Sequence, residues 1–333
     1  MDAREFHQGL VVVDGHCDTI GDIVGTSFSD PSAPPRDFLA RGAAGHIDLP
    51  RLVEGGVTCQ AMALFTDDKF MSDAPGRTRL LLDALESLLA STDAMFLARR
   101  AADVLRAKAE GRVAALFAIE GGEAIGEPEV GLDALRSYHS RGLRMMGLTW
   151  NRRNAIARGV GADGAGGITE FGRRVVAEME RLGIIVDASH LSDEALDDLF
   201  AIAERPIVAT HSNSRELCPH RRNLLDSQVE RIAATGGLVG VTFAGIFVDP
   251  DPAKVTVERI ADHVDRLVSV AGAEHVGLGS DFDGFTARYG QAFSSCAELP
   301  RLTEVLLGRG HPPEDVAKIM GGNWLRVIGE IAG

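Results

Sequence analysis

Three histidines and three carboxylates stand at the ends of apolar runs in this sequence. His16 and Asp18, for example, directly follow the run LVVVDG at 10–15. Side chains of these types cost solvation energy if they are buried without partners, so they must be paired with something. Imidazole and carboxylate groups suit Zn²⁺, and also Mn²⁺ or Co²⁺. The pattern therefore predicts a metal site built from His16, Asp18, Glu120, His190, His211 and Asp281.

These six residues are more than one four-coordinate zinc ion with an open position needs. Two metal ions about 3.5–4 Å apart would use them. A carboxylate has two oxygens, and Glu120 stands on a run between the two groups, so it is the natural bridge. Taken alone, each histidine is better read as an ordinary hydrogen-bonding residue, and Asp281 as a helix cap. The joint pattern, in which they track the ends of runs, favours the metal site.

Eight apolar runs alternate with helical patterns along the chain. The runs are continuous rather than alternating, as expected for strands that are buried on both faces. This order predicts one domain over 1–333 with a parallel (β/α)8 barrel of the TIM type. A doubly wound open sheet is the alternative, but no G-x-G-x-x-G follows the first run. The predicted strands are 10–15, 57–65, 113–121, 143–150, 183–190, 206–212, 238–245 and 275–284, and the predicted helices are 79–90, 133–142, 169–183, one from Ser192, 226–236, 256–271 and 313–328.

A barrel would bring the six residues together, because its strands all end at one face and active sites lie there. Ser192 is predicted to cap one helix, and Asp226 another. The proline-containing segment 25–45 is predicted to be an irregular insertion. Segments 66–78 and 285–297 are expected to be loops that cover the site.

The net charge, the apolar runs and the cysteines of the sequence exclude some kinds of partner and indicate where in the cell the protein acts. The 333 residues carry a formal net charge of −14, which argues against nucleic acid or an anionic membrane surface as a partner. No uncharged run of 18 residues and no leader pattern is found, so no membrane contact is expected. The four cysteines, Cys17, Cys59, Cys218 and Cys296, form no CxxC pair, which predicts free thiols and a cytoplasmic location.

Several stretches together resemble the renal (membrane) dipeptidase family of the amidohydrolase superfamily. The order and spacing agree over nearly the whole chain, and the combination is specific although no single piece is. The stretches are DGHCDT (14–19), HIDLPRLVEGGV (46–57), AIEGG (118–122), DASHLSD (187–193), THSN (210–213), CPHRRN (218–223), GLGSDFDG (277–284) and GGNWLRV (321–327).

The resemblance implies a dipeptidase with two Zn²⁺ ions per subunit, acting on L-Xaa-L-Xaa and L-Xaa-D-Xaa dipeptides through a metal-activated hydroxide, and a homodimer. By motif, His16 and Asp18 match the ligands of one metal, His190 and His211 those of the other, and Glu120 the bridge. Asp281 matches the acid/base residue, and Arg222 matches the arginine that binds the substrate's α-carboxylate. A planar guanidinium suits such a carboxylate. Without the family pattern, a surface ion pair would be the better interpretation of Arg222.

One departure concerns the stretch after the fourth run, GLTWN at 147–151. Trp150 stands where the family has a substrate-contacting histidine, and an indole can donate a hydrogen bond but cannot accept a proton. Trp150 and Asn151 are thus predicted to contact substrate in a changed way. Two other functions stay open: a deacylase or lactam hydrolase acting on N-acyl amino acids, and a non-catalytic metal-binding protein.

Overall fold

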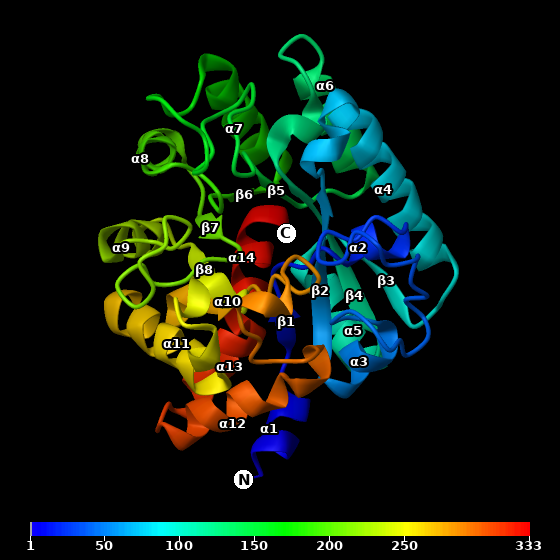
Figure 1. Cartoon of the computed structure of the whole chain (residues 1–333), viewed down its shortest axis with the longest axis vertical. Coiled ribbons are helices and arrows are strands. Elements are labelled where there is room, and N and C mark those ends of the chain that lie inside the picture. The colour runs from blue at the N-terminus through cyan, green and yellow to red at the C-terminus, as the bar shows by residue number, and fades with distance from the viewer. Residues whose placement is uncertain (1) are drawn as a thin grey trace.

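The structure is a computed structural model that describes residues 2–333. Its strands are parallel and form a closed ring with helices around it (Figure 1). The ring runs β1, β2, β4, β5, β6, β7, β8 and β9, and β1 pairs with β9 to close it. The predicted (β/α)8 barrel is therefore confirmed. The strands are β1 (Val12–Asp14), β2 (Val57–Phe65), β3 (Met95–Ala98), β4 (Val113–Glu120), β5 (Met145–Gly147), β6 (Ile185–Asp187), β7 (Ile207–Ala209), β8 (Leu238–Val241) and β9 (Val276–Leu278).

All eight predicted strands are present, and β3 is an additional one. It pairs with the first half of β4, from Met95 opposite Val113 to Ala98 opposite Leu116. The second half of β4 pairs with β5 instead, so β3 lies outside the closed ring. The sequence MFLA is too short and too weakly patterned to have been recognised as a strand.

The helices surround the barrel and also close one of its ends. The predicted helix over 313–328 is wrong as a single element, because a π-helical turn at 318–322 separates α13 from α14. Gly321 in that turn lies against the backbone of β1, where a Cβ would come within 2.2 Å of the Val11 carbonyl oxygen. The helices are α1 (Ala3–Gly9), α2 (Thr19–Ile23), α3 (Leu49–Glu54), α4 (Ala74–Ala90), α5 (Ala101–Glu110), α6 (Gly131–Arg141), α7 (Glu170–Leu182), α8 (Asp193–Ile202), α9 (Asp226–Ala234), α10 (Gly245–Val248), α11 (Val257–Ala271), α12 (Pro300–Gly308), α13 (Pro313–Ala317) and α14 (Asn323–Ala332).

The predicted helix starts are confirmed in one case and wrong in another. Ser192 caps α8 by accepting a hydrogen bond from the Ala195 N–H. Asp226 is the first residue of α9 rather than its cap, and its carboxylate pairs with Arg266. The Gln228 side chain accepts the Leu225 N–H at this helix start instead.

The three predicted loops have different outcomes. The insertion at 25–45 is irregular, as expected. The segment 66–78 is only partly a loop, because a 3₁₀ turn occupies 68–73 and α4 begins at Ala74. The segment 285–297 contains short 3₁₀ turns, and its first residues line the cavity described below.

The core lies in two layers on either side of the ring of strands. A small inner group, including Val13, Ala61 and Leu116, fills the barrel together with Trp324 from α14. The Trp324 indole N–H donates to the Leu278 carbonyl oxygen at 2.8 Å. Helix α14 packs against the start of β9, as shown by the bonds from the Asn323 amide to the carbonyls of Ala273 and Val276. The opposite end, where the strands finish, stays available for a site.

Candidate metal centre and active site

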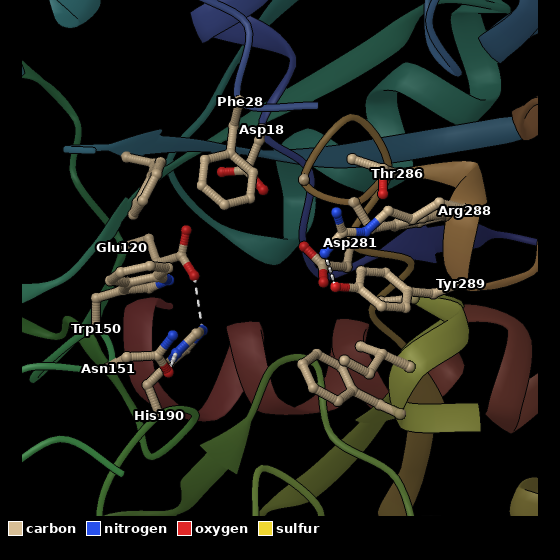
Figure 2. Close-up of a pocket in the computed structure, with 16 residues that line it drawn as sticks. Asp18, Phe28, Glu120, Trp150, Asn151, His190, Asp281, Thr286, Arg288 and Tyr289 are labelled. Atoms are coloured by element: carbon tan, nitrogen blue, oxygen red, sulfur yellow. Dashed lines mark hydrogen bonds and ion pairs between the residues drawn. The ribbon is translucent and has the colours of Figure 1, made fainter. Parts of the chain in front are cut away.

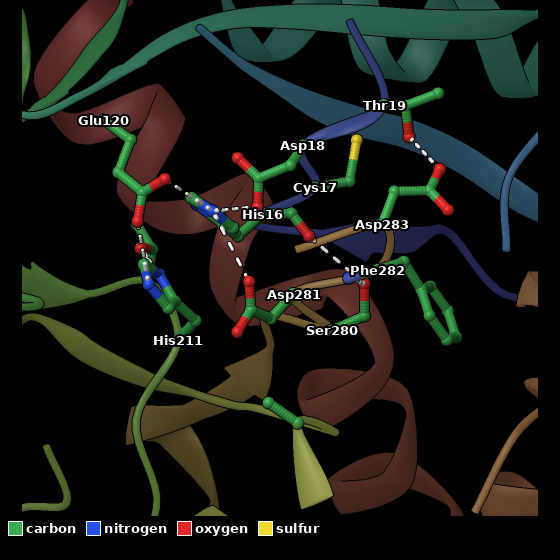
Figure 3. Close-up of polar contacts among 12 residues, drawn as sticks. His16, Cys17, Asp18, Thr19, Glu120, His211, Ser280, Asp281, Phe282 and Asp283 are labelled. Carbon is green, nitrogen blue, oxygen red and sulfur yellow. Dashed lines mark hydrogen bonds and ion pairs between the residues drawn. The ribbon is translucent and has the colours of Figure 1, made fainter. Parts of the chain in front are cut away.

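The six predicted site residues come together where the strands finish. His16, His190, His211 and Asp281 lie just beyond β1, β6, β7 and β9, and Glu120 is the last residue of β4. Asp18 directly precedes α2. Figures 2 and 3 show their side chains converging on one another from these different elements. All six residues are buried.

Glu120 lies between two groups of ligand atoms. Its Oε1 is 2.8 Å from the Nε2 of His190 and 3.4 Å from the Nε2 of His211. Its Oε2 faces the other way and is 3.6 Å from the Nε2 of His16 (Figure 3). The two oxygens of one carboxylate thus serve two sides of the cluster, as a bridging ligand requires.

The protonation of His211 is set by a hydrogen-bond chain behind it. The Thr210 hydroxyl donates its only hydrogen to Asp187 at 2.7 Å. The same oxygen lies 2.7 Å from the Nδ1 of His211, so this nitrogen must carry the hydrogen and donate it. The Nε2 of His211 is therefore an unprotonated acceptor that faces Glu120. Such a partner for the second ring nitrogen is typical of histidines that bind metals.

Asn151 fixes the ring of His190 in the same way. Its amide oxygen can only accept, and it lies 2.9 Å from the Nδ1 of His190. The Nε2 of His190 is then also an acceptor, and it lies 2.9 Å from the Nε2 of His211. Burial lowers the pKa of His190 to about 3, with the Arg222 charge acting in the same direction. Three acceptors, two imidazoles and a carboxylate oxygen, therefore meet with no hydrogen between them, which suits a cation.

The other side of the cluster also has unsatisfied acceptors. The Nε2 of His16 and the Oδ1 of Asp18 are buried and have no hydrogen-bond partner among residues 2–333. The His16 Nε2 lies 3.5 Å from Asp18 and 4.0 Å from Asp281. Two sets of ligand atoms are compact enough for a metal: His16 with Glu120 and His211, and His16 with Asp18 and Asp281. Both sets include His16, and the donor types and these orphaned atoms suit a divalent cation.

Electrostatics differ among the three carboxyl groups. Burial would raise the pKa of Glu120, but the neighbouring His16 holds it well below its ordinary value. Burial raises the pKa of Asp18 well above its ordinary value, and the Glu120 charge adds to this. Burial also raises the pKa of Asp281, to about 6. Neighbouring carboxyls with divergent pKa values are typical of a catalytic site.

The residues with an unusual backbone conformation also lie at this site. Among residues 2–333, the non-glycine residues with left-handed φ are His190 (69°), Asp281 (62°) and Asp283 (66°). This region is costly for residues with a Cβ and clusters at functional sites. Two of the three positions are predicted site residues, so the fold holds these side chains in place at a cost in backbone energy.

Two buried aspartates that support the site were not singled out from the sequence. Asp14, at the end of β1, accepts from the Ser280 hydroxyl at 2.6 Å and its N–H at 2.8 Å, and so ties β1 to the Asp281 loop. Asp283 accepts from Thr19 at 2.7 Å and Arg36 at 2.6 Å, and so ties that loop to α2 and the insertion. Asp14 lies in the stretch DGHCDT and Asp283 in GLGSDFDG, both of which resemble the family. Their place in these stretches is the feature of the sequence that could have identified them.

A cavity of about 330 Å³ opens beside the six residues. Asp18, Glu120, His190 and Asp281 line it, so the proposed ligands are reached from it. Trp150 and Asn151 also line it, as expected for the stretch GLTWN (Figure 2). Phe28 and Phe65 lie beside Trp150, whereas Phe247, Arg288 and Tyr289 belong to the segments after β8 and β9.

Arg222 is buried rather than at the surface. It forms no ion pair with any residue that the structure describes, and its weak hydrogen bonds reach Ser212 (3.5 Å) and the His211 carbonyl (3.3 Å). Its Nε has no partner, and its guanidinium stacks over Phe247, 5.3 Å from the ring centre. A buried guanidinium without a counter-ion is costly, and a bound carboxylate would offset that cost. The alternative interpretation as a surface ion pair does not fit this environment.

Comparisons with known proteins agree with this geometry. A family model described as "Membrane dipeptidase (Peptidase family M19)" matches residues 1–333. Dipeptidase tcpJ of Claviceps purpurea is 31% identical over 330 residues, covering 96% of this chain and 76% of that protein. The crystal structure of dipeptidase AC, a metallopeptidase of family M19, has a TM-score of 0.86 at 30% identity and covers 97% of this chain and 99% of that one. A metallopeptidase from Rhodobacter sphaeroides, solved with a phosphinate mimic of the dipeptide L-Ala-D-Ala, has a TM-score of 0.84 at 30% identity, with 97% and 99% covered.

Proposed function

This chain belongs to the membrane dipeptidase family, peptidase family M19, and is a metal-dependent hydrolase of dipeptides; from this premise we propose which of its residues do the chemistry. The dipeptidase predicted from the sequence is thereby confirmed. Among residues 2–333 no helix has the length and apolarity to cross a bilayer. The observation that carries the residue assignment is Glu120, whose two oxygens face two separate groups of histidine nitrogens.

We propose two zinc ions with Glu120 as the bridging ligand. His16 and Asp18 would hold one ion, and His190 and His211 the other. The unprotonated Nε2 atoms of His190 and His211 and the orphaned atoms of His16 and Asp18 support this division. When bound, zinc supplies Lewis acidity and lowers the pKa of water from about 15.7 towards roughly 7.

The proposed role of Asp281 is to move the proton during hydrolysis. Its carboxyl is buried at the cavity, and its Oδ1 is 4.0 Å from the Nε2 of His16. A buried carboxyl at this position can accept a proton from the attacking water and return it to the leaving amine. Its left-handed backbone holds the carboxylate toward the cavity (Figure 2).

Arg222 is proposed to bind the α-carboxylate of the substrate. Its guanidinium lacks a counter-ion in the protein, and a planar carboxylate can accept two hydrogen bonds from it. One anchoring point close to the proposed metals sets the distance from the carboxylate to the scissile bond, so the residue released is the C-terminal one of a short peptide. The Rhodobacter sphaeroides relative was solved with a mimic of L-Ala-D-Ala, which supports L-Xaa-D-Xaa dipeptides as substrates. The proposal that L-Xaa-L-Xaa dipeptides are also cleaved rests on the family resemblance.

Trp150 and Asn151 are proposed to act differently from each other. Asn151 orients His190 through the 2.9 Å contact, besides lining the cavity. Trp150 forms part of the cavity wall, and its indole N–H is the only polar group it offers a substrate. In family members with a histidine at this position, that histidine contacts the scissile carbonyl oxygen. Here the metals alone would polarise this carbonyl.

Assembly and location are also proposals. A homodimer rests on the family resemblance. The four cysteines are all free and buried, which supports a reducing compartment such as the cytoplasm. Residues 1–333 are proposed to form one domain, since a single barrel contains the site.

The test is hydrolysis of an L-Xaa-L-Xaa and L-Xaa-D-Xaa library by the zinc-loaded protein, with matched N-acetyl amino acids alongside. We expect cleavage of dipeptides, and loss of that cleavage in Glu120→Gln. Activity on the acyl compounds with none on dipeptides would favour the deacylase instead. Zinc binding without hydrolysis of any compound would favour the non-catalytic protein.

A further inference from the structure

We propose that Phe28, Phe65 and Trp150 form an aromatic wall that selects a large apolar side chain on the N-terminal residue of the dipeptide. We further infer that Arg152 is a positioning residue that holds Trp150 in this wall. The inference rests on the proposed function, because it assigns the orientation of a dipeptide in the cavity.

The three rings form one continuous surface in the cavity. Phe65 and Trp150 have ring centres 5.1 Å apart, and Phe28 packs edge-on against both, at 5.5 Å and 6.2 Å. Trp150 also lies 5.9 Å from the ring of His190. Phe28 remains 37% exposed, which is high for a phenylalanine and indicates a surface that is free to bind an apolar group.

The order of the barrel strands places Phe65, the part of this wall on β2, opposite Arg222. Arg222 follows β7, and in the ring of eight strands the one farthest from β7 is β2. Phe65 is the last residue of β2 and pairs with Glu120 at the end of β4. A dipeptide with its carboxylate at Arg222 and its scissile carbonyl near Glu120 would therefore point its N-terminal residue toward Phe65. An extended dipeptide spans about 7 Å, so one residue reaches each side.

Arg152 supports Trp150 from outside the cavity. Its guanidinium lies over the indole ring, 4.9 Å from the centre, where a cation and an aromatic face attract each other. It is fixed by the Oε1 of Glu123 at 2.9 Å and by Asp68. Glu123 is buried and also accepts from Asn154 at 2.9 Å. This network ties the 150–154 loop to the turn at 68–73 and leaves Trp150 little freedom to move.

The chemistry of the wall predicts which side chains it accepts. Aromatic faces gain from burying leucine, methionine or phenylalanine side chains, whereas a carboxylate placed there would lose hydration without gaining a partner. One methylene more or less in an apolar pocket changes the specificity constant by roughly tenfold to two-hundredfold. We therefore expect the zinc-loaded enzyme to cleave L-Leu-L-Ala and L-Phe-L-Ala at least about tenfold more efficiently than Gly-L-Ala.

The experiment measures kcat/KM for Gly-L-Ala, L-Leu-L-Ala, L-Phe-L-Ala and L-Glu-L-Ala, and for L-Ala-Gly and L-Ala-L-Leu as the reversed series. The variants are Trp150→Ala, Trp150→Phe and Arg152→Gln. Arg174→Gln is the matched control, since Arg174 also lies over an aromatic ring, that of Phe171, but on the outer helix α7. The chain has two tryptophans, so the emission of Trp150 is obtained as the difference between the wild type and Trp150→Phe, in which only Trp324 emits.

For Trp150→Ala we expect the ratio of kcat/KM for L-Leu-L-Ala to kcat/KM for Gly-L-Ala to fall about tenfold, mainly through a higher KM for L-Leu-L-Ala. Trp150→Phe should largely keep this ratio. Arg152→Gln should lower the same ratio and shift the emission of Trp150, whereas Arg174→Gln should do neither. A wild-type enzyme that cleaves all these dipeptides with equal efficiency would overturn the inference but leave the proposed function intact. If kcat/KM depends only on the C-terminal residue, which the series L-Ala-Gly and L-Ala-L-Leu varies, the proposed orientation of the dipeptide is wrong. No cleavage of any dipeptide would instead contradict the proposed function.

Discussion

The Nε2 atoms of His190 and His211 face each other at 2.9 Å, and neither has a hydrogen to place between them. Each ring donates through its other nitrogen, His190 to Asn151 and His211 to Thr210. Two lone pairs held this close, with the Oε1 of Glu120 beside them, repel unless a cation lies among them. A bound cation would therefore relieve an unfavourable contact between the two rings.

Removing metal should therefore destabilise the protein. A ligand that binds the native state alone stabilises it by about 2.7 kcal/mol at a hundredfold excess over its Kd. We expect a zinc chelator to lower Tm by several degrees, and added zinc to restore it, when unfolding is followed by calorimetry. His211→Ala should show a smaller difference, whereas His139→Ala, in helix α6 away from the site, should keep the full difference. A Tm that is indifferent to zinc in the wild type would contradict the assignment.

Thr210→Val should weaken metal binding although Thr210 is not a ligand. The valine keeps the shape of the side chain but leaves the Nδ1 of His211 without its acceptor, so the ring loses its fixed tautomer and orientation. Loss of such an outer partner typically costs about 10–100-fold in metal affinity. Zinc affinity measured by competition with a chelator should fall by this amount. Thr78→Val, at another buried threonine whose hydroxyl bonds within α4, should bind zinc as the wild type does.

Asp281→Asn should retain zinc and lose turnover. The amide has nearly the same shape as the carboxylate but cannot carry the proton, and general acid–base catalysis contributes about 10²–10⁴-fold. We expect kcat on L-Ala-L-Ala to fall in this range while the zinc content by atomic absorption is unchanged. Turnover close to that of the wild type would rule out the proton-carrying role, and loss of zinc would assign Asp281 to the ligands.

The barrel and the convergence of the site were predictable from the sequence because both depend on local patterns. Continuous apolar runs identify buried strands, and polar residues at their ends mark one face of a parallel barrel. His190 and Glu120 are far apart in the chain, yet this rule alone predicts that they meet. The strand β3 escaped prediction because its four residues carry no distinct pattern.

Contacts that depend on side-chain geometry could not be predicted in the same way. Nothing in the pattern of GLTWN shows that Asn151 accepts from His190, or that Arg152 stacks on Trp150. The hydrogen-bond chain from Asp187 through Thr210 to His211 likewise joins residues 23 positions apart, and it depends on the geometry of one hydroxyl group. The helix start at Asp226 was wrong for the same reason, because Gln228 supplies the bond that a capping aspartate would have made.

Arg222→Met should separate binding from stability. Arg222 is buried and forms no ion pair with a described residue, and the charges of Asp281 and Glu120 act on it only from a longer distance. Replacing it with an apolar side chain should therefore leave Tm equal or higher. The same change should lower kcat/KM on dipeptides by about 10²-fold or more, since hydrogen bonds to a charged group are lost. Dipeptide amides, which lack the carboxylate, should be cleaved equally poorly by both proteins. A Tm that falls by several degrees would contradict the unpaired state of Arg222.

The pH dependence of stability should contain a contribution from His263 in helix α11. Its Nδ1 accepts the Ser214 N–H at 3.2 Å, and its Nε2 donates to the Val248 carbonyl at 2.8 Å, so the buried ring fits only in its neutral form. Burial lowers the pKa of His263 to about 4, below the value of 6.5 for the unfolded chain. Between these two pH values the unfolded state binds more protons, so this contribution is complete above pH 6.5 and is lost as the pH falls toward 4.

The expected loss from His263 over this interval is roughly 3 kcal/mol, because each pKa unit corresponds to about 1.4 kcal/mol. Urea unfolding at several pH values between 4 and 7 measures it, and the quantity to compare is the slope of the unfolding free energy against pH. His263→Gln keeps one donor and one acceptor but does not titrate, so its slope should be shallower than that of the wild type even if it is less stable at pH 7. His275→Gln, at a half-buried histidine bonded to the Gly237 carbonyl, serves as the matched control. Equal slopes for the wild type and His263→Gln would show that the ring of His263 does not stay neutral in the fold.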